Sequence, residues 1–127
     1  MLILMVAAGG AAGAVARYSL SGWVQSLVGS TFPMGTLVVN GLGSFLLGLS
    51  LYFFSNLAMT PEVRSMVTIG FLGGFTTFST FSYETTVLLE GGEWLRGGMY
   101  VGGSLILGLA GVVAGMALGS FILQGRG

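Results

Sequence analysis

The sequence predicts an all-α membrane protein, a single domain of four transmembrane helices. Of its 127 residues, 54% are hydrophobic and only 6% are charged, whereas a soluble domain carries about 25% charged residues. Glycine occurs 24 times, which suits transmembrane helices because small residues let their backbones approach closely. Four apolar stretches, each of the roughly 20 residues that a membrane crossing needs, follow one another with short connections.

We place the four membrane spans at residues 2–28, 35–57, 62–89 and 97–123, so that one domain covers residues 1–127. Thr60-Pro61-Glu62 has the residues expected where a helix begins: a capping threonine, a proline at the first position and an acid in the first turn. Each connection is too short to hold a second domain.

Composition also excludes several classes of function. The chain has no Cys and no His, which removes thiol and histidine nucleophile chemistry and the usual zinc sites. There is no basic patch for nucleic acid and no Gly-Lys motif for nucleotide phosphates. We therefore expect neither an enzyme nor a partner of nucleic acids or nucleotides.

The arginines give little orientation signal. Arg64 and Arg126 belong to one side of the predicted bundle, and Arg96 to the other, together with Arg17 if that residue reaches the first loop. Orientation normally follows the Lys and Arg balance of the loops. A nearly even count leaves two interpretations: a single charge decides the orientation, or the chain inserts both ways and pairs antiparallel.

The third span carries the most informative segment, residues 70–82. Gly73 and Gly74 are followed by a cluster of Thr, Ser and Phe. Glycine disfavours a helix interior, and Thr and Ser offer the backbone alternative hydrogen bonds. We predict a mid-membrane break in which the glycine pair ends one half-helix and Thr76 or Thr77 caps the next. Such a break is tolerated only where protein or a wet cavity surrounds it, and its two half-helix ends suit small ions. The alternative is a continuous helix with a glycine packing site.

Phe78 and Phe81 lie three residues apart on the second half-helix, so they share a face. The positive edges of two phenyl rings could replace part of the water shell of an anion without trapping it. Ordinary packing is the alternative for this pair.

Other polar residues interrupt the apolar spans. Arg17 is a candidate for pairing or function, unless it reaches the membrane interface. Asn40, Ser44 and Gly48 form one stripe of the second span, either a packing seam or a pore lining. Glu84 follows the break as a further candidate.

In the fourth span, Tyr100 and Ser104 share a face with Gly108. A separate ridge of small residues predicts helix packing, and it consists of Gly111, Gly115 and Gly119.

With these residues together, the sequence resembles the Fluc (CrcB) family of fluoride channels over nearly its whole length. The resemblance is carried by residues 9–18, residues 35–40, the distinctive residues 73–82 and residues 100–104. It implies a passive fluoride channel in the cell's inner (plasma) membrane that exports fluoride before it reaches toxic levels. It also implies an antiparallel, dual-topology homodimer with two pores.

Residue roles follow from the same resemblance. Phe78 and Phe81 match the rings that line the pore, Asn40 matches a pore-facing amide, and Tyr100 and Ser104 match the start of a polar track.

The resemblance further implies a structural sodium ion between subunits, held by the backbone carbonyls of Gly73 and Thr76. The polar track can continue one turn after Ser104, where this chain has Gly108. Water, or Ser79 and Thr80, would then complete it.

Two other functions compete with this interpretation. A small multidrug exporter is also a short four-helix protein, but it needs a membrane carboxylate in its first span, where this chain has Arg17. A non-transporting membrane protein would use its glycines for packing alone and would leave the Thr, Ser and Phe cluster unexplained.

Overall fold

The computed structural model describes residues 1–125, and all regular secondary structure in that range is helical. Arg126, which entered the predicted charge balance, lies outside the described residues. Three long helices are apolar enough to cross a membrane: α1 (Leu2–Val28), α2 (Met34–Asn56) and α6 (Trp94–Gln124). Between α2 and α6 lie α3 (Pro61–Ser65), the π-helix η1 (Met66–Phe71), α4 (Leu72–Phe75) and α5 (Ser79–Glu90).

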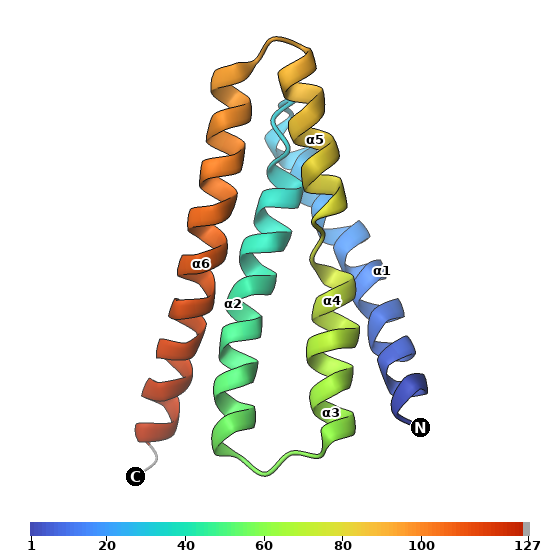
Figure 1. The fold of residues 1–127 in the computed structure, drawn as a ribbon, viewed down its shortest axis with the longest axis vertical. Coiled ribbons are helices and arrows are strands. Elements are labelled where there is room, and N and C mark those ends of the chain that lie inside the picture. The colour runs from blue at the N-terminus through green and yellow to red at the C-terminus, as the bar shows by residue number, and fades with distance from the viewer. Residues whose placement is uncertain (126–127) are drawn as a thin grey trace.

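The chain runs up and down the long axis of the molecule. Figure 1 shows the N-terminus, the α2–α3 connection and the end of α6 at one end, and the α5–α6 turn at the other. The short segments from α3 to α5 follow one another between these ends as one interrupted column (Figure 1). On its sides, α6 packs along α2, and α1 packs along η1 and α4.

Glycines make both of these seams. A Cβ atom added at Gly48 of α2 would overlap the carbonyl oxygen of Val112, and one added at Gly115 would overlap that of Phe45. The predicted ridge Gly111, Gly115 and Gly119 therefore faces α2. On the other seam, Gly13 of α1 is equally close to the backbone of Phe71.

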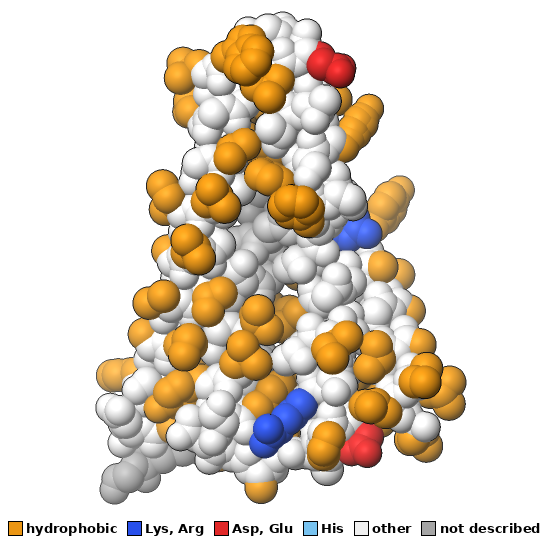
Figure 2. Space-filling view, viewed as in Figure 1, with side chains coloured by type: hydrophobic (Ala, Val, Ile, Leu, Met, Phe, Trp, Pro, Cys, Tyr) orange, Lys and Arg blue, Asp and Glu red, His pale blue; other side chains and the backbone are white. Residues whose placement is uncertain are grey.

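The outside of the molecule is apolar. Large hydrophobic side chains such as Ile3, Leu51 and Leu109 are exposed on all three long helices. Figure 2 shows hydrophobic side chains along the whole length of one face, with few charged groups among them. Together with the three apolar helices, this surface identifies a multi-pass membrane protein whose exterior suits lipid.

The helix break lies slightly later than predicted. We expected Gly73 and Gly74 to end the first half-helix, but α4 continues to Phe75, and the first residue with extended backbone is Thr76 (φ −90°, ψ 157°). The reason is packing, because a Cβ at Gly74 would lie 2.6 Å from the carbonyl oxygen of Gly10 in α1. Gly74 therefore allows α4 to pack closely against α1, and it does not end the helix.

Candidate functional site

Asn40 of the neighbouring helix α2 stabilises the break by hydrogen bonding to its backbone. Its Oδ1 accepts a hydrogen bond from the Thr77 backbone N–H (2.8 Å), and its Nδ2 donates to the Thr77 carbonyl (2.9 Å). One side chain thus satisfies both backbone groups of a residue that has left the helix, which removes the main cost of interrupting a helix in a membrane. The structure shows the interhelical role for Asn40, while its role as an anion donor stays a prediction.

Thr77 makes a capping contact from one residue before the N-cap position of α5, which is Phe78 and has no side-chain cap bond of its own. The Thr77 hydroxyl accepts a hydrogen bond from the backbone N–H of Thr80 (3.2 Å) in the first turn of α5 and donates to the Thr80 hydroxyl (3.1 Å). N-terminal amides of a helix need such acceptors.

The carbonyls of Gly73 and Thr76 are among those that lose their helical donors at the break. In a continuous helix, the amides of Thr77 and Thr80 would bond to the carbonyls of Gly73 and Thr76. Here those amides donate to side chains of Asn40 and Thr77 instead. Carbonyl oxygens freed in this way are the ligands that hard cations take in broken membrane helices, so the predicted sodium-binding pair fits the backbone observed here.

Arg17 satisfies one of the two carbonyls between them, that of Gly74. Its Nε donates to the Gly74 carbonyl oxygen (3.1 Å), so the side chain turns to the break and does not reach the first loop. A cation at the end of α4 is favourable because carbonyls there carry partial negative charge. Of the two interpretations left open by the sequence, the structure supports pairing.

A cavity of about 360 Å³ lies beside the break. Its walls come from α2, η1, α4, α5 and α6, and no charged side chain lines it among the described residues. Its lining includes the predicted residues Asn40, Gly73, Thr76, Phe78, Phe81 and Ser104. Ser79 and Thr80 begin α5 next to Phe78 but lie outside this lining.

Aromatic rings form a row that leaves the cavity. The Phe78 and Phe81 ring centroids are 5.8 Å apart, Phe81 is 5.2 Å from Tyr100, and Tyr100 is 5.6 Å from Phe32 in an edge-to-face contact. Tyr100 is fully buried, whereas Phe78 is 78% exposed. The row therefore joins the open side of the cavity to the end of the molecule where α1 meets α2.

Glu84 lies beside this row and joins three helices. Its Oε1 accepts hydrogen bonds from the hydroxyls of Thr36 (2.6 Å) and Tyr100 (3.1 Å). Thr36 belongs to α2 and Tyr100 to α6, so the carboxylate of α5 ties both helices together.

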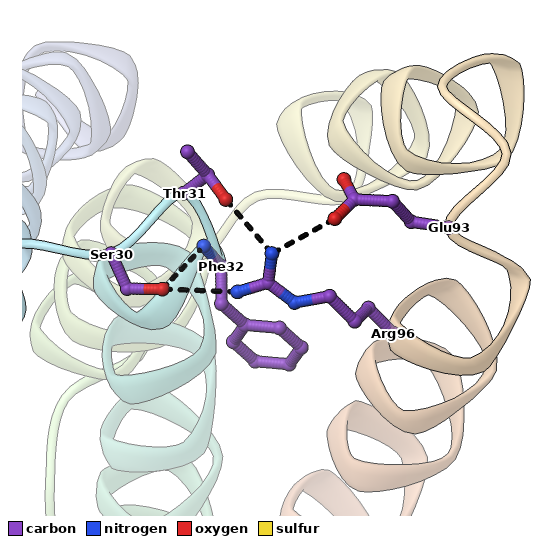
Figure 3. Close-up of polar contacts among 5 residues, drawn as sticks. All are labelled: Ser30, Thr31, Phe32, Glu93 and Arg96. Carbon is purple, nitrogen blue, oxygen red and sulfur yellow. Dashed lines mark hydrogen bonds and ion pairs between the residues drawn. The ribbon is translucent and has the colours of Figure 1, made fainter.

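At the end of the row, Arg96 fastens the α1–α2 connection to α6 (Figure 3). Its guanidinium donates to the hydroxyls of Thr31 (2.9 Å) and Ser30 (3.0 Å) and to the carboxylate of Glu93 (2.9 Å). It also lies over the Phe32 ring, 5.7 Å from the centroid. This cluster fixes the ring that contacts Tyr100.

Sequence reasoning did not assign Thr36 or Arg96 to the site. Thr36 precedes Asn40 by one helical turn, so the α2 stripe could have been extended back to it. Arg96 stands in the first turn of α6, where the helix dipole disfavours a cation, and that position could have indicated specific partners.

Comparison with known proteins places this arrangement in a family. The family described as CrcB-like protein, Camphor Resistance (CrcB), matches residues 4–116. The chain belongs to the CrcB family. A CrcB relative from Thermus thermophilus is 49% identical over 120 residues, which is 94% of each chain. One from Maridesulfovibrio salexigens is 44% identical over 95% of this chain and 97% of its own. Another, from Geobacter sulfurreducens, is 52% identical over 90% and 93%. All three are named fluoride-specific ion channel FluC.

Proposed function

We propose that this CrcB protein is a fluoride-selective channel, and not an enzyme, which lets fluoride leave the cell down its electrochemical gradient. The observation that carries the proposal is the broken helix beside an uncharged cavity, in a chain about half identical to channels named for fluoride. Membrane-depth backbone of this kind is maintained where it lines a path or a binding site. The location is the plasma membrane, where a leak for fluoride protects a microbial cell.

The ion path follows the cavity and the aromatic row. An anion enters between Ser104 and the rings of Phe78 and Phe81, whose positive edges face it. It then passes toward Tyr100 and Glu84, where a tyrosine hydroxyl exchanges its acceptor for the ion. The absence of a full positive charge among the described lining residues favours rapid release, which conduction requires.

A second copy of the chain completes the pore. Phe78 and Ile69 are 78% and 65% exposed and Gly73 is also exposed, so the broken segment has an uncovered face at membrane depth. An antiparallel copy would cover that face and give two pores related by a two-fold axis. The freed carbonyls of Gly73 and Thr76 from both copies would provide four oxygens for one sodium ion, which would be structural.

Charge placement supports insertion in both orientations. With Arg17 bonded to the break, Arg64 and Arg96 remain as the described arginines of the opposite loop ends. With Arg126 counted from the sequence on the Arg64 side, the bias under the rule that positive loops stay inside is a single charge. Reporter tags at the C-terminus should appear on both sides of the membrane, and tags on one side alone would exclude the antiparallel pair.

The function is tested in liposomes that hold the purified protein and potassium fluoride, with a fluoride electrode outside. A passive channel moves charge, so fluoride efflux should begin only when valinomycin lets potassium follow. Matched liposomes with potassium chloride should lose little chloride. Efflux without valinomycin would indicate a coupled transporter, and no efflux from folded protein would refute the channel.

A further inference from the structure

The α2 stripe Asn40, Ser44 and Gly48 divides into two parts in the structure. Asn40 binds the break, and Gly48 packs so closely on the backbone of Val112 in α6 that it belongs to a seam. Ser44 lies between them and lines the cavity. The stripe is therefore cavity wall as far as Ser44 and packing seam from Gly48 onward.

Most hydroxyls in the cavity wall are already occupied. Those of Thr68 and Thr76 donate to backbone carbonyls of their own helices, and that of Thr77 donates to Thr80. The Ser104 hydroxyl is buried and has no hydrogen-bond partner among the described residues. Among these residues the structure likewise assigns no bond to Ser44, which leaves two serine hydroxyls for a ligand.

Because position 108 of α6 is glycine, a hydroxyl one turn beyond Ser104 in the cavity wall has to come from another helix. Gly108 lies one helical turn after Ser104, and a Cβ added to it would come 3.7 Å from Ser44 Oγ. A Cβ built at Gly111 would instead meet the Ser44 Cβ, at 3.3 Å. The Ser44 hydroxyl thus lies beside the Gly108 position, on the Ser104 side of its own Cβ.

We infer that Ser44 is an anion-contacting residue of the channel. It provides from α2 the hydroxyl that α6 lacks at Gly108, so that the polar lining passes from Ser104 across to Ser44. This inference rests on the proposed function. The buried Ser104 hydroxyl without a partner costs free energy, and a small, strongly hydrated anion that accepts from it and from the part-exposed Ser44 hydroxyl would offset that cost. Neutral donors also let the ion leave.

The sequence suggested water, or Ser79 and Thr80, for the same place. The Thr80 hydroxyl is bonded to Thr77, and neither Ser79 nor Thr80 lines the cavity. Ser44 is the lining hydroxyl next to Gly108 in the described structure.

The test moves the hydroxyl from one helix to the other. Ser44→Ala should slow fluoride efflux from liposomes about tenfold, the loss expected for one hydrogen bond to a charged group. Adding Gly108→Ser to Ser44→Ala should restore most of the rate, because the new side chain fits at ordinary contact distance. Adding Gly108→Ala should not restore it. Ser55→Ala, which removes an exposed hydroxyl that bonds to its own helix, serves as the control and should leave efflux unchanged.

Each outcome decides a different statement. Efflux at the wild-type rate in Ser44→Ala, together with slow efflux in Ser104→Ala, would refute the inference about Ser44. The proposed pore through this cavity would still stand. Failure of Gly108→Ser to rescue, with full folding by gel filtration, would assign Ser44 to packing and also refute the inference. Normal efflux in both Ser44→Ala and Ser104→Ala would move the path out of this cavity. A wild-type protein without fluoride flux would refute the channel itself.

Discussion

Replacing Asn40 by leucine should collapse the break, because this side chain satisfies both backbone groups of Thr77. Side-chain hydrogen bonds between membrane helices contribute about 0.6 kcal/mol each on average. Here the substitution also leaves a part-buried N–H and C=O without partners, at about 1–3 kcal/mol each. We therefore expect Asn40→Leu to lower the free energy of unfolding by roughly 2–6 kcal/mol and to abolish fluoride efflux.

The matched variant is Asn40→Asp, which keeps the acceptor for the Thr77 N–H but loses the donor to the Thr77 carbonyl. It should cost about half as much stability, and its added negative charge should slow an anion further. Thermal unfolding in detergent measures the stability of both variants, and liposome efflux measures their transport. An Asn40→Leu protein as stable as wild type would refute the assignment of Asn40 as the support of the break.

Other substitutions test the remaining contacts. Phe78→Ile and Phe81→Ile keep apolar bulk without a ring edge, so fluoride efflux should fall while dimers persist in gel filtration; unchanged efflux in both would exclude the ring-edge role. Arg17→Met leaves the Gly74 carbonyl unpaired and should lower the unfolding free energy by about 1–3 kcal/mol, measured by thermal unfolding; an unchanged midpoint would mean that solvent replaces the bond. Gly48→Ala should prevent close packing of α2 on α6 and destabilise the fold by several kcal/mol, on the order of other overpacked sites. The control is Gly98→Ala, whose added Cβ would meet nothing within 4 Å and which should be neutral or slightly stabilising. Equal thermal unfolding midpoints for the two variants would refute the glycine seam between α2 and α6.

The apolar helices and the interruption could be predicted because they depend on composition and local preference. Runs of apolar residues identify long helices, and a cluster of Gly, Thr and Ser disfavours a continuous one. The location of the break could not be predicted from the glycines. Gly74 is needed for close packing against Gly10, which lies far away in sequence. The π-helix Met66–Phe71 has no comparable local signature.

The site was predicted in part for the same reason. Residue type alone marks Asn40 as unusual in an apolar span, whereas the roles of Phe78 and Ser104 came from the family resemblance. The partners of these residues depend on how the helices meet, so sequence could not show that Asn40 would bind Thr77 or that Arg17 would bind Gly74. Serine at position 44 is ordinary in a membrane helix, and only the space at Gly108 gives it significance.

The arginine cluster of Figure 3 makes the two ends of the helical bundle structurally different. Arg96 fastens one end, whereas α1 and α6 spread apart toward the other (Figure 1). In the proposed antiparallel pair, each membrane face would then carry one fastened end and one spread end. A single pore would have unlike mouths and could pass current better in one direction, but its twin points the opposite way. The pair would therefore have a symmetric current–voltage relation, and blocking one pore should both halve the current and reveal rectification.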